Sequence, residues 1–216
     1  MNLSRLLQLA SPTLPVGAYS YTGGLEAAIE AGVVKDAASA ERWIGDVLEL
    51  SLVRMEVPML WGLVLAFSKK DFTHAKSLNT KFLASRETAE LRAETVQMGF
   101  SLNKLFKDLE IGDVPVDEPS FPAAYAFAAS QWKIEPQAAL QAYLWAWLEN
   151  QVMAAVKAVP LGQTDGQRIL LSLGDLLPGL AKKAIEMKHE ELGNFAPGLA
   201  ILSSRHEIQY SRLFRS

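Results

Sequence analysis

The fold is decided by residues 137–159, QAALQAYLWAWLENQVMAAVKAV. Apolar side chains recur in this stretch at helical spacing and lie on more than one face, which indicates a helix surrounded by the rest of the protein. Polar residues interrupt it at Gln141, Glu149 and Lys157, which favours a buried helix of a soluble protein over a membrane-spanning one. We therefore expect a central helix here.

Helical spacing continues on both sides of this stretch. Asp36 is expected to cap a helix that runs to Met55, Pro58 to start a second helix, and Asp71 to cap a third. Further helices are expected from near Leu25 and at Thr88–Leu109, Ala123–Trp132, Gln167–Leu176, Leu180–Lys188 and Pro197–Tyr210. The sequence lacks a convincing alternating strand. It predicts an all-α, single-domain helical bundle of about 7–10 helices over residues 1–216.

Composition narrows the function. Hydrophobic residues make up 50% and charged residues 21%, as in a globular domain, and the net charge of −3 argues against nucleic-acid binding. The chain has no cysteine and three histidines, His74, His189 and His206, so it has few of the ligands that metals such as zinc prefer. We expect no resident metal and no cofactor.

Motifs for catalysis are also missing. The sequence has neither a phosphate-binding P-loop nor a dinucleotide fingerprint, and the spacing Glu87, Glu90, Glu94 on a helix is typical of a solvated charge stripe. We expect no catalytic residues. The N-terminus, MNLSRLLQLASPTLPVG, lacks the long apolar core of a secretory signal, so we expect a cytoplasmic protein without a membrane segment.

Four segments are unusual for a plain helical bundle. They are QLASPTLPVGAYSYTGGLE (8–26), SRETAELRAE (85–94), VPLGQTDGQRIL (159–170) and SSRHEIQYSRLFRS (203–216). Each segment allows a structural role and an interaction role. The first would be a cap on the bundle or a docking surface, and the second a solvated face or a partner contact. The third would hold buried glutamines or make a partner contact, and the fourth would be a frayed end or an interface. Arginine and aromatic residues, which dominate the last segment, are the residues that protein interfaces favour.

In this order, the four segments resemble the motifs of the urease accessory protein F family. The resemblance runs through most of the chain and implies an all-α, dimeric chaperone that is not itself an enzyme. It implies binding to accessory protein D (called H in some species) and recruitment of the GTPase accessory protein G. The assembly would deliver nickel to the urease apoprotein.

Partner-binding residues follow from the resemblance motif by motif. Pro12, Pro15 and Gly17 would shape the opening loop, and the tail 203–216 is expected to be mobile when unbound and to order against accessory protein D. The residues that match the motifs and are expected at partner contacts are Tyr19, Glu26, Glu30, Arg86, Glu87, Arg92, Gln163, Gln167, Arg205, His206, Glu207, Tyr210, Arg212, Leu213, Phe214 and Arg215.

Two alternatives stay open. In the first, the chain activates or checks the GTPase accessory protein G. An activator in trans typically donates an arginine to the GTPase. The candidates are Arg86, Arg92, Arg205 and Arg212. The other alternative is an unrelated all-α enzyme with a small-molecule pocket, which a ligand that raises the melting temperature would reveal.

Overall fold

The computed structural model describes residues 2–216, apart from the side chain of His189. Within these residues the chain is all-α and has no strand, as predicted. The helices are α1 (Leu3–Ala10), α2 (Leu25–Glu30), α3 (Ala37–Val47), α4 (Val57–Ser68), α5 (Phe72–Ala84), α6 (Ala89–Asp108), α7 (Phe121–Gln131), α8 (Pro136–Ala158), α9 (Gln163–Gly174), α10 (Leu177–Glu186) and α11 (Pro197–His206).

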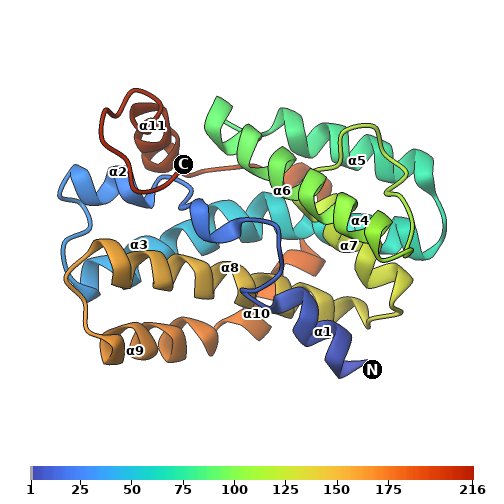
Figure 1. Cartoon of the computed structure of the whole chain (residues 1–216), viewed down its shortest axis with the longest axis horizontal. Coiled ribbons are helices and arrows are strands. Elements are labelled where there is room, and N and C mark those ends of the chain that lie inside the picture. The colour runs from blue at the N-terminus through green and yellow to red at the C-terminus, as the bar shows by residue number, and fades with distance from the viewer. Residues whose placement is uncertain (1) are drawn as a thin grey trace.

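Helix α8 is central, as the sequence predicts. It lies across the middle of the molecule, with α9 packed on one side and α2 on the other (Figure 1). Its residues Leu140, Leu144 and Leu148 are completely buried. A second layer forms where α7 packs between α4 and α6, and α7 is short and alanine-rich, so neighbouring helices approach it closely.

The predicted break before Pro58 is wrong. Helices α3 and α4 are joined by a π-helical segment, Leu48–Glu56, into one continuous helix, Ala37–Ser68. Proline has no N–H to bond the carbonyl of Arg54 four residues earlier. The N–H of Gly193 bonds that carbonyl at 3.2 Å instead, and the N–H of Phe195 bonds Leu50 O at 3.3 Å. Gly193 and Phe195, which are distant in the sequence, therefore supply hydrogen bonds to backbone carbonyls whose lack of a partner would otherwise end the helix.

The continuous helix is long and apolar enough to cross a membrane by length and composition alone. Its most apolar window is, however, 56% buried inside the protein. Leu60, Leu63 and Val64 are fully enclosed by neighbouring helices. This burial is the pattern of a core helix in a soluble protein.

Three predicted helix starts are confirmed by their caps. The side chain of Asp36 accepts the N–H of Ser39 at 2.8 Å, Asp71 that of His74 at 3.0 Å, and Thr88 that of Leu91 at 3.2 Å. Each bond satisfies a backbone donor that the first helical turn leaves unpaired. Helix α1, by contrast, was not predicted. If α3 and α4 are taken as one helix, the eleven α-helical segments give ten helices in the part of the chain described, within the expected range.

Candidate interaction site

The chain after α11 turns back over the molecule. Residues 207–216, called the tail below, run from α11 to the junction of α2 with the opening loop (residues 11–24), where the C-terminal end is marked in Figure 1. Phe214 and Ser216 are buried there. The backbone N–H of Arg215 donates to Ser20 O at 2.8 Å. Two segments almost two hundred residues apart thus lie side by side.

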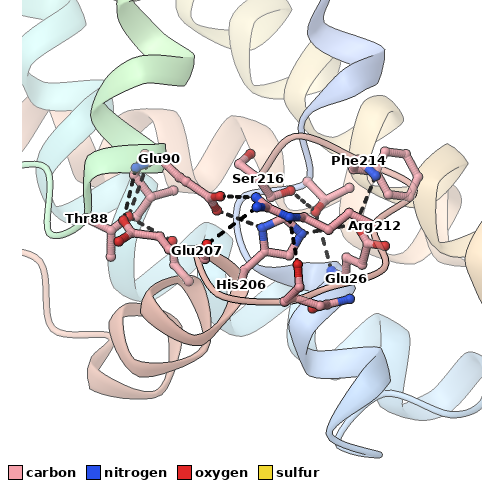
Figure 2. Close-up of polar contacts among 12 residues, drawn as sticks. Glu26, Thr88, Glu90, His206, Glu207, Arg212, Phe214 and Ser216 are labelled. Carbon is pink, nitrogen blue, oxygen red and sulfur yellow. Dashed lines mark hydrogen bonds and ion pairs between the residues drawn. The ribbon is translucent and has the colours of Figure 1, made fainter.

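Glu26 on α2 holds the tail in place. It is only 7% exposed. Its two carboxylate oxygens accept the N–H of Leu213 at 2.6 Å and the N–H of Phe214 at 2.9 Å. Hydrogen bonds to a carboxylate are stronger than those between neutral groups. Glu26 therefore fixes the backbone of the tail at Leu213, whose side chain is exposed, and at Phe214, whose side chain is buried. Figure 2 shows Glu26 and Phe214 at this contact.

His206 joins Glu26 to a second carboxylate. Its ring is completely buried, with Nε2 3.1 Å from Glu26 Oε2 and Nδ1 2.7 Å from Glu90 Oε2. A neutral imidazole donates from only one nitrogen, whereas an imidazolium donates from both. Each ring nitrogen of His206 faces one carboxylate oxygen, and the ring therefore joins α2 to α6.

Arg212 completes this network. Its Nη1 lies 2.6 Å from Glu90 Oε1, and its Nε donates to Gln209 O at 3.0 Å. Glu207 accepts the backbone N–H of Glu90 at 3.3 Å. Figure 2 shows these groups converging from α2, α6 and α11. We call Glu26, Glu90, His206 and Arg212 the tail-holding network.

The last residue described is anchored separately. The backbone oxygen of Ser216 accepts hydrogen bonds from the backbone N–H of Thr22 at 3.0 Å and from the Thr22 hydroxyl. The Ser216 side-chain Oγ donates to Glu94 at 2.8 Å. Burial is the main cause that raises the pKa of the Glu94 carboxyl to about 7, while the hydrogen bond from Ser216 opposes the rise.

The outer face of the tail is apolar. Ile208 is 86% exposed, Leu213 67%, and Tyr210 fully exposed. Arg205 and Arg215 are exposed close by in the sequence. Exposed tyrosine, leucine and arginine together are typical of a surface that binds protein, because such side chains supply contact area and directed hydrogen bonds.

Several residues predicted at partner contacts lie inside the protein in this structure. Glu26, His206 and Phe214 were expected at a partner surface, but they are buried and act from within to position the tail. Arg86 is internal too: its guanidinium pairs with Glu56 at 3.2 Å and stacks on the ring of Phe82. In this conformation all four residues contribute to internal contacts.

Other predicted residues are on the surface. Glu30 ends α2 in solvent, Tyr19 is 74% exposed, and Arg92 pairs with Glu118 on the surface. Glu87 is also exposed. The remaining exposed predictions are Gln163, Gln167, Arg205, Tyr210, Arg212, Leu213 and Arg215, with Glu207 half-buried.

The first, second and fourth motifs meet at the tail, but the third does not. Gln163 and Gln167 are exposed at the start of α9. That helix lies at the opposite edge of the molecule from α11 (Figure 1). Of the two roles left open for these glutamines, their exposure excludes the one in which they satisfy loop groups inside the protein.

Sequence reasoning missed Glu90 and Glu94 as tail contacts. The stripe Glu87, Glu90, Glu94 was interpreted as solvated, and only Glu87 is fully exposed. Glu90 and Glu94 share one face of α6 because they are four residues apart. That spacing is the same for a solvated stripe and for a docking face, so only the position of the tail separates the two.

The fold and this site define a helical protein whose docked C-terminal tail exposes large apolar side chains. Within residues 2–216 as described, no group of three or more acidic, histidine or cysteine side chains is placed to hold a metal. A family model described as UreF matches residues 34–174.

Curated relatives match nearly the whole chain. A urease accessory protein UreF from Azoarcus sp. is 57% identical over 99% of this chain and 95% of its own length. Proteins with the same description from Dechloromonas aromatica and Alkalilimnicola ehrlichii are 52% and 44% identical, over 100% and 98% of this chain and 98% and 95% of their own lengths. The chain belongs to the UreF family of urease accessory proteins. It therefore has an accessory role in urease maturation and is not an enzyme.

Proposed function

We propose that the chain is an adaptor that binds urease accessory protein D (or H) and recruits the GTPase accessory protein G, so that nickel reaches the urease apoprotein. It would act in the cytoplasm as a homodimer. The outer face of the tail, Ile208, Tyr210 and Leu213, is the observation that carries the proposal. Solvent-exposed apolar side chains on a fixed backbone are ready to bury on binding, with little further ordering cost.

Charged groups beside the tail would orient the partner. Arg205, Arg212 and Arg215 are exposed on or next to it, and Glu207 is half-exposed. Tyr19, Glu30, Glu87, Arg92, Gln163 and Gln167 remain proposed contacts of a wider interface. The position of α9 away from the tail fits a second partner for the two glutamines better than a share in one contact surface.

Co-purification tests the adaptor role. The full-length chain would be expressed with accessory proteins D and G and the urease apoprotein, and the complex sized by light scattering. The variant Tyr210→Ala/Leu213→Ala keeps the tail-holding network and removes the apolar outer face. We expect at least tenfold less accessory protein D to be recovered with this variant than with the unsubstituted chain.

The matched control is Phe100→Ala/Leu109→Ala, which removes an exposed aromatic on α6 and an exposed leucine just after its end. We expect it to recover the complex in full. Both variants must melt like the unsubstituted protein. A tail variant that still recovers accessory protein D at the control level would contradict the proposal.

Regulation of the GTPase is a second candidate function. Among the four arginines considered, Arg86, Arg92 and Arg212 pair with carboxylates, whereas Arg205 has no ion pair among the residues described. A catalytic arginine supplied to a GTPase must be able to reach the phosphate. Steady-state GTP turnover with Arg205→Ala would fall at unchanged complex formation if the chain activates the GTPase, and would stay unchanged if it does not.

A further inference from the structure

A cavity of about 370 Å³ lies beside the attachment of the tail. It is lined mainly by α1, the opening loop, α6 and α8, is partly open to solvent, and has a mostly apolar wall. Leu9, Leu14, Met98 and Trp147 contribute to that wall. Its size falls at the small end of pockets that bind small molecules. Glu94, which anchors Ser216, and Tyr19 also line it, but the adaptor role proposed above assigns no function to the space itself.

One deeply buried polar side chain faces the cavity. Gln151 on α8 lines it and is only 4% exposed. Among the described residues, no protein group hydrogen-bonds its side-chain amide, whereas the neighbouring Asn150 donates to Tyr21 O at 3.0 Å. A buried amide without a protein partner is costly unless something else bonds to it. The Gln151 amide is not among the fully buried polar atoms without a partner, so it is accessible from the cavity and offers an acceptor and a donor to a ligand there.

The charge of the wall is one-sided. Its charged side chains are Glu56, Glu94, Glu149 and Arg86. Arg86 is neutralised by Glu56, whose other oxygen also accepts the Tyr143 hydroxyl. Glu94 has one hydrogen bond among the described residues, from Ser216 Oγ. The wall thus carries three carboxylates and one guanidinium, and the buried Nε of Arg86 has no hydrogen-bond partner among the described residues. Glu94 and Glu149 form no ion pair there, so the wall keeps a net negative charge.

We propose that this cavity binds an alkyl chain that ends in a primary ammonium or guanidinium group. The chain would pack against the apolar wall, and the cationic head would donate to Glu94 and to the Gln151 carbonyl. Such a group is either a free amine or a lysine or arginine side chain of a partner protein. The half-exposed Met153 and the exposed Tyr19 also line the cavity and give it a flexible, partly aromatic rim.

Protonation supports this assignment. Burial raises the pKa of Glu94 to about 7, with Glu56 and Glu90 adding to the rise and Arg86 and Ser216 opposing it. A cation binds the ionised carboxylate, whose fraction grows roughly tenfold between pH 6 and pH 8 for a group of that pKa. Amine binding should strengthen with pH over this range by about that factor.

Titration of the isolated full-length protein tests the proposal. Hexylammonium chloride is the probe, with 1-hexanol and hexanoate as neutral and anionic controls of the same chain length, and chemical shifts as readout. We expect hexylammonium to bind at least tenfold more tightly than either control. Glu94→Gln should remove that preference, because it keeps the shape and loses the charge. Glu186→Gln, an exposed carboxylate on α10, is the matched control and should change nothing.

A second variant guards against a folding defect in Glu94→Gln. Ala146 lines the cavity on α8, and Ala146→Phe should fill it and abolish binding while the protein still unfolds cooperatively. Equal binding of hexylammonium and hexanol, or unchanged binding by Glu94→Gln, would overturn the proposal. The test contains no accessory protein, so its outcome is independent of the adaptor function.

The two sources are separated by a second ligand, the capped peptide acetyl-Ala-Lys-Ala-amide. Tighter binding of the peptide than of hexylammonium assigns the cavity to a partner's side chain. Tighter binding of hexylammonium assigns it to a free amine. If neither binds to the unsubstituted protein, the inference is wrong.

Discussion

The central helix α8 and the tail are held to the protein by different forces. Leu140, Leu144 and Leu148 of α8 are completely buried in the hydrophobic core. The tail buries one large side chain, Phe214, and is otherwise held by hydrogen bonds to the carboxylates of Glu26, Glu90 and Glu94 and to the backbone at Ser20 and Thr22. Apolar packing is insensitive to pH, whereas bonds to carboxylates depend on their charge. The comparison indicates a stable body that carries a tail with its own, weaker attachment.

The largest effect should come from the body. Leu144→Ala removes a fully buried side chain from α8. We expect the free energy of unfolding to fall by about 2–5 kcal/mol, because transfer and cavity terms add. Denaturant unfolding measures the change. Leu171→Ala, which truncates an exposed leucine on α9, should stay within about 0.5 kcal/mol. Equal effects of the two variants would contradict the packing described for α8.

Glu94 should make stability depend on pH. Its pKa is raised to about 7 in the folded protein from 4.5. Between these values the folded state binds the extra proton, so the free energy of unfolding falls as pH rises through this window and levels off above pH 7. The loss amounts to at most roughly 3 kcal/mol, at 1.36 kcal/mol for each pKa unit.

The measurement is the difference between the unsubstituted protein and Glu94→Gln, each unfolded by denaturant from pH 4.5 to 8. The difference isolates Glu94 from other titrating groups. We expect the substituted protein to lose less stability as the pH rises. Parallel curves for the two proteins would show that Glu94 does not titrate as described.

A smaller and local effect is expected at Glu26. Glu26→Gln leaves the Leu213 and Phe214 N–H groups with a weaker acceptor and His206 with one carboxylate. Tail opening should become easier by about 1–3 kcal/mol, the usual range for a buried hydrogen bond to a charged group. Amide hydrogen exchange should accelerate at Leu213 and Phe214 by tenfold or more while α8 amides stay protected. If amide exchange in α8 accelerated to the same extent, the tail would open only together with the helical body, which would contradict a separate attachment.

The smallest effect should come from Arg212. Its pair with Glu90 is partly exposed, and such pairs contribute about 0–1 kcal/mol. Arg212→Gln should accelerate tail exchange less than Glu26→Gln, and added salt should narrow the difference between the unsubstituted protein and Arg212→Gln. A larger effect than that of Glu26→Gln would place the main attachment at Arg212.

Local patterns predicted the body better than the site. The spacing in α8, the caps Asp36 and Asp71 and the helix start at Thr88 depend on neighbours within four residues, and all were confirmed. The continuity of α3 and α4 depends on Gly193, which bonds a carbonyl some 140 residues away in the chain. Helical spacing carries no information about such a partner.

The site likewise depends on contacts between residues that are far apart in the sequence. Glu26 and His206 are 180 residues apart and were both named from the motifs, but as surface contacts. A motif identifies residue types and their order, and cannot say whether a histidine faces solvent or lies between two carboxylates. The charge stripe on α6 was misjudged for the same reason. The mobility of residues 203–216 in solution stays a prediction, which the structure refines: 203–206 belong to α11, and 207–216 are docked.

Amide hydrogen exchange of the full-length protein, alone and with accessory protein D, tests the central claim most directly. We predict that the Leu213 and Phe214 amides are protected in the free protein, that they open at a lower free energy than α8, and that the partner raises their protection. Exchange of these two amides at the rate of an unfolded chain, with or without the partner, would contradict both the docked tail and its role in binding.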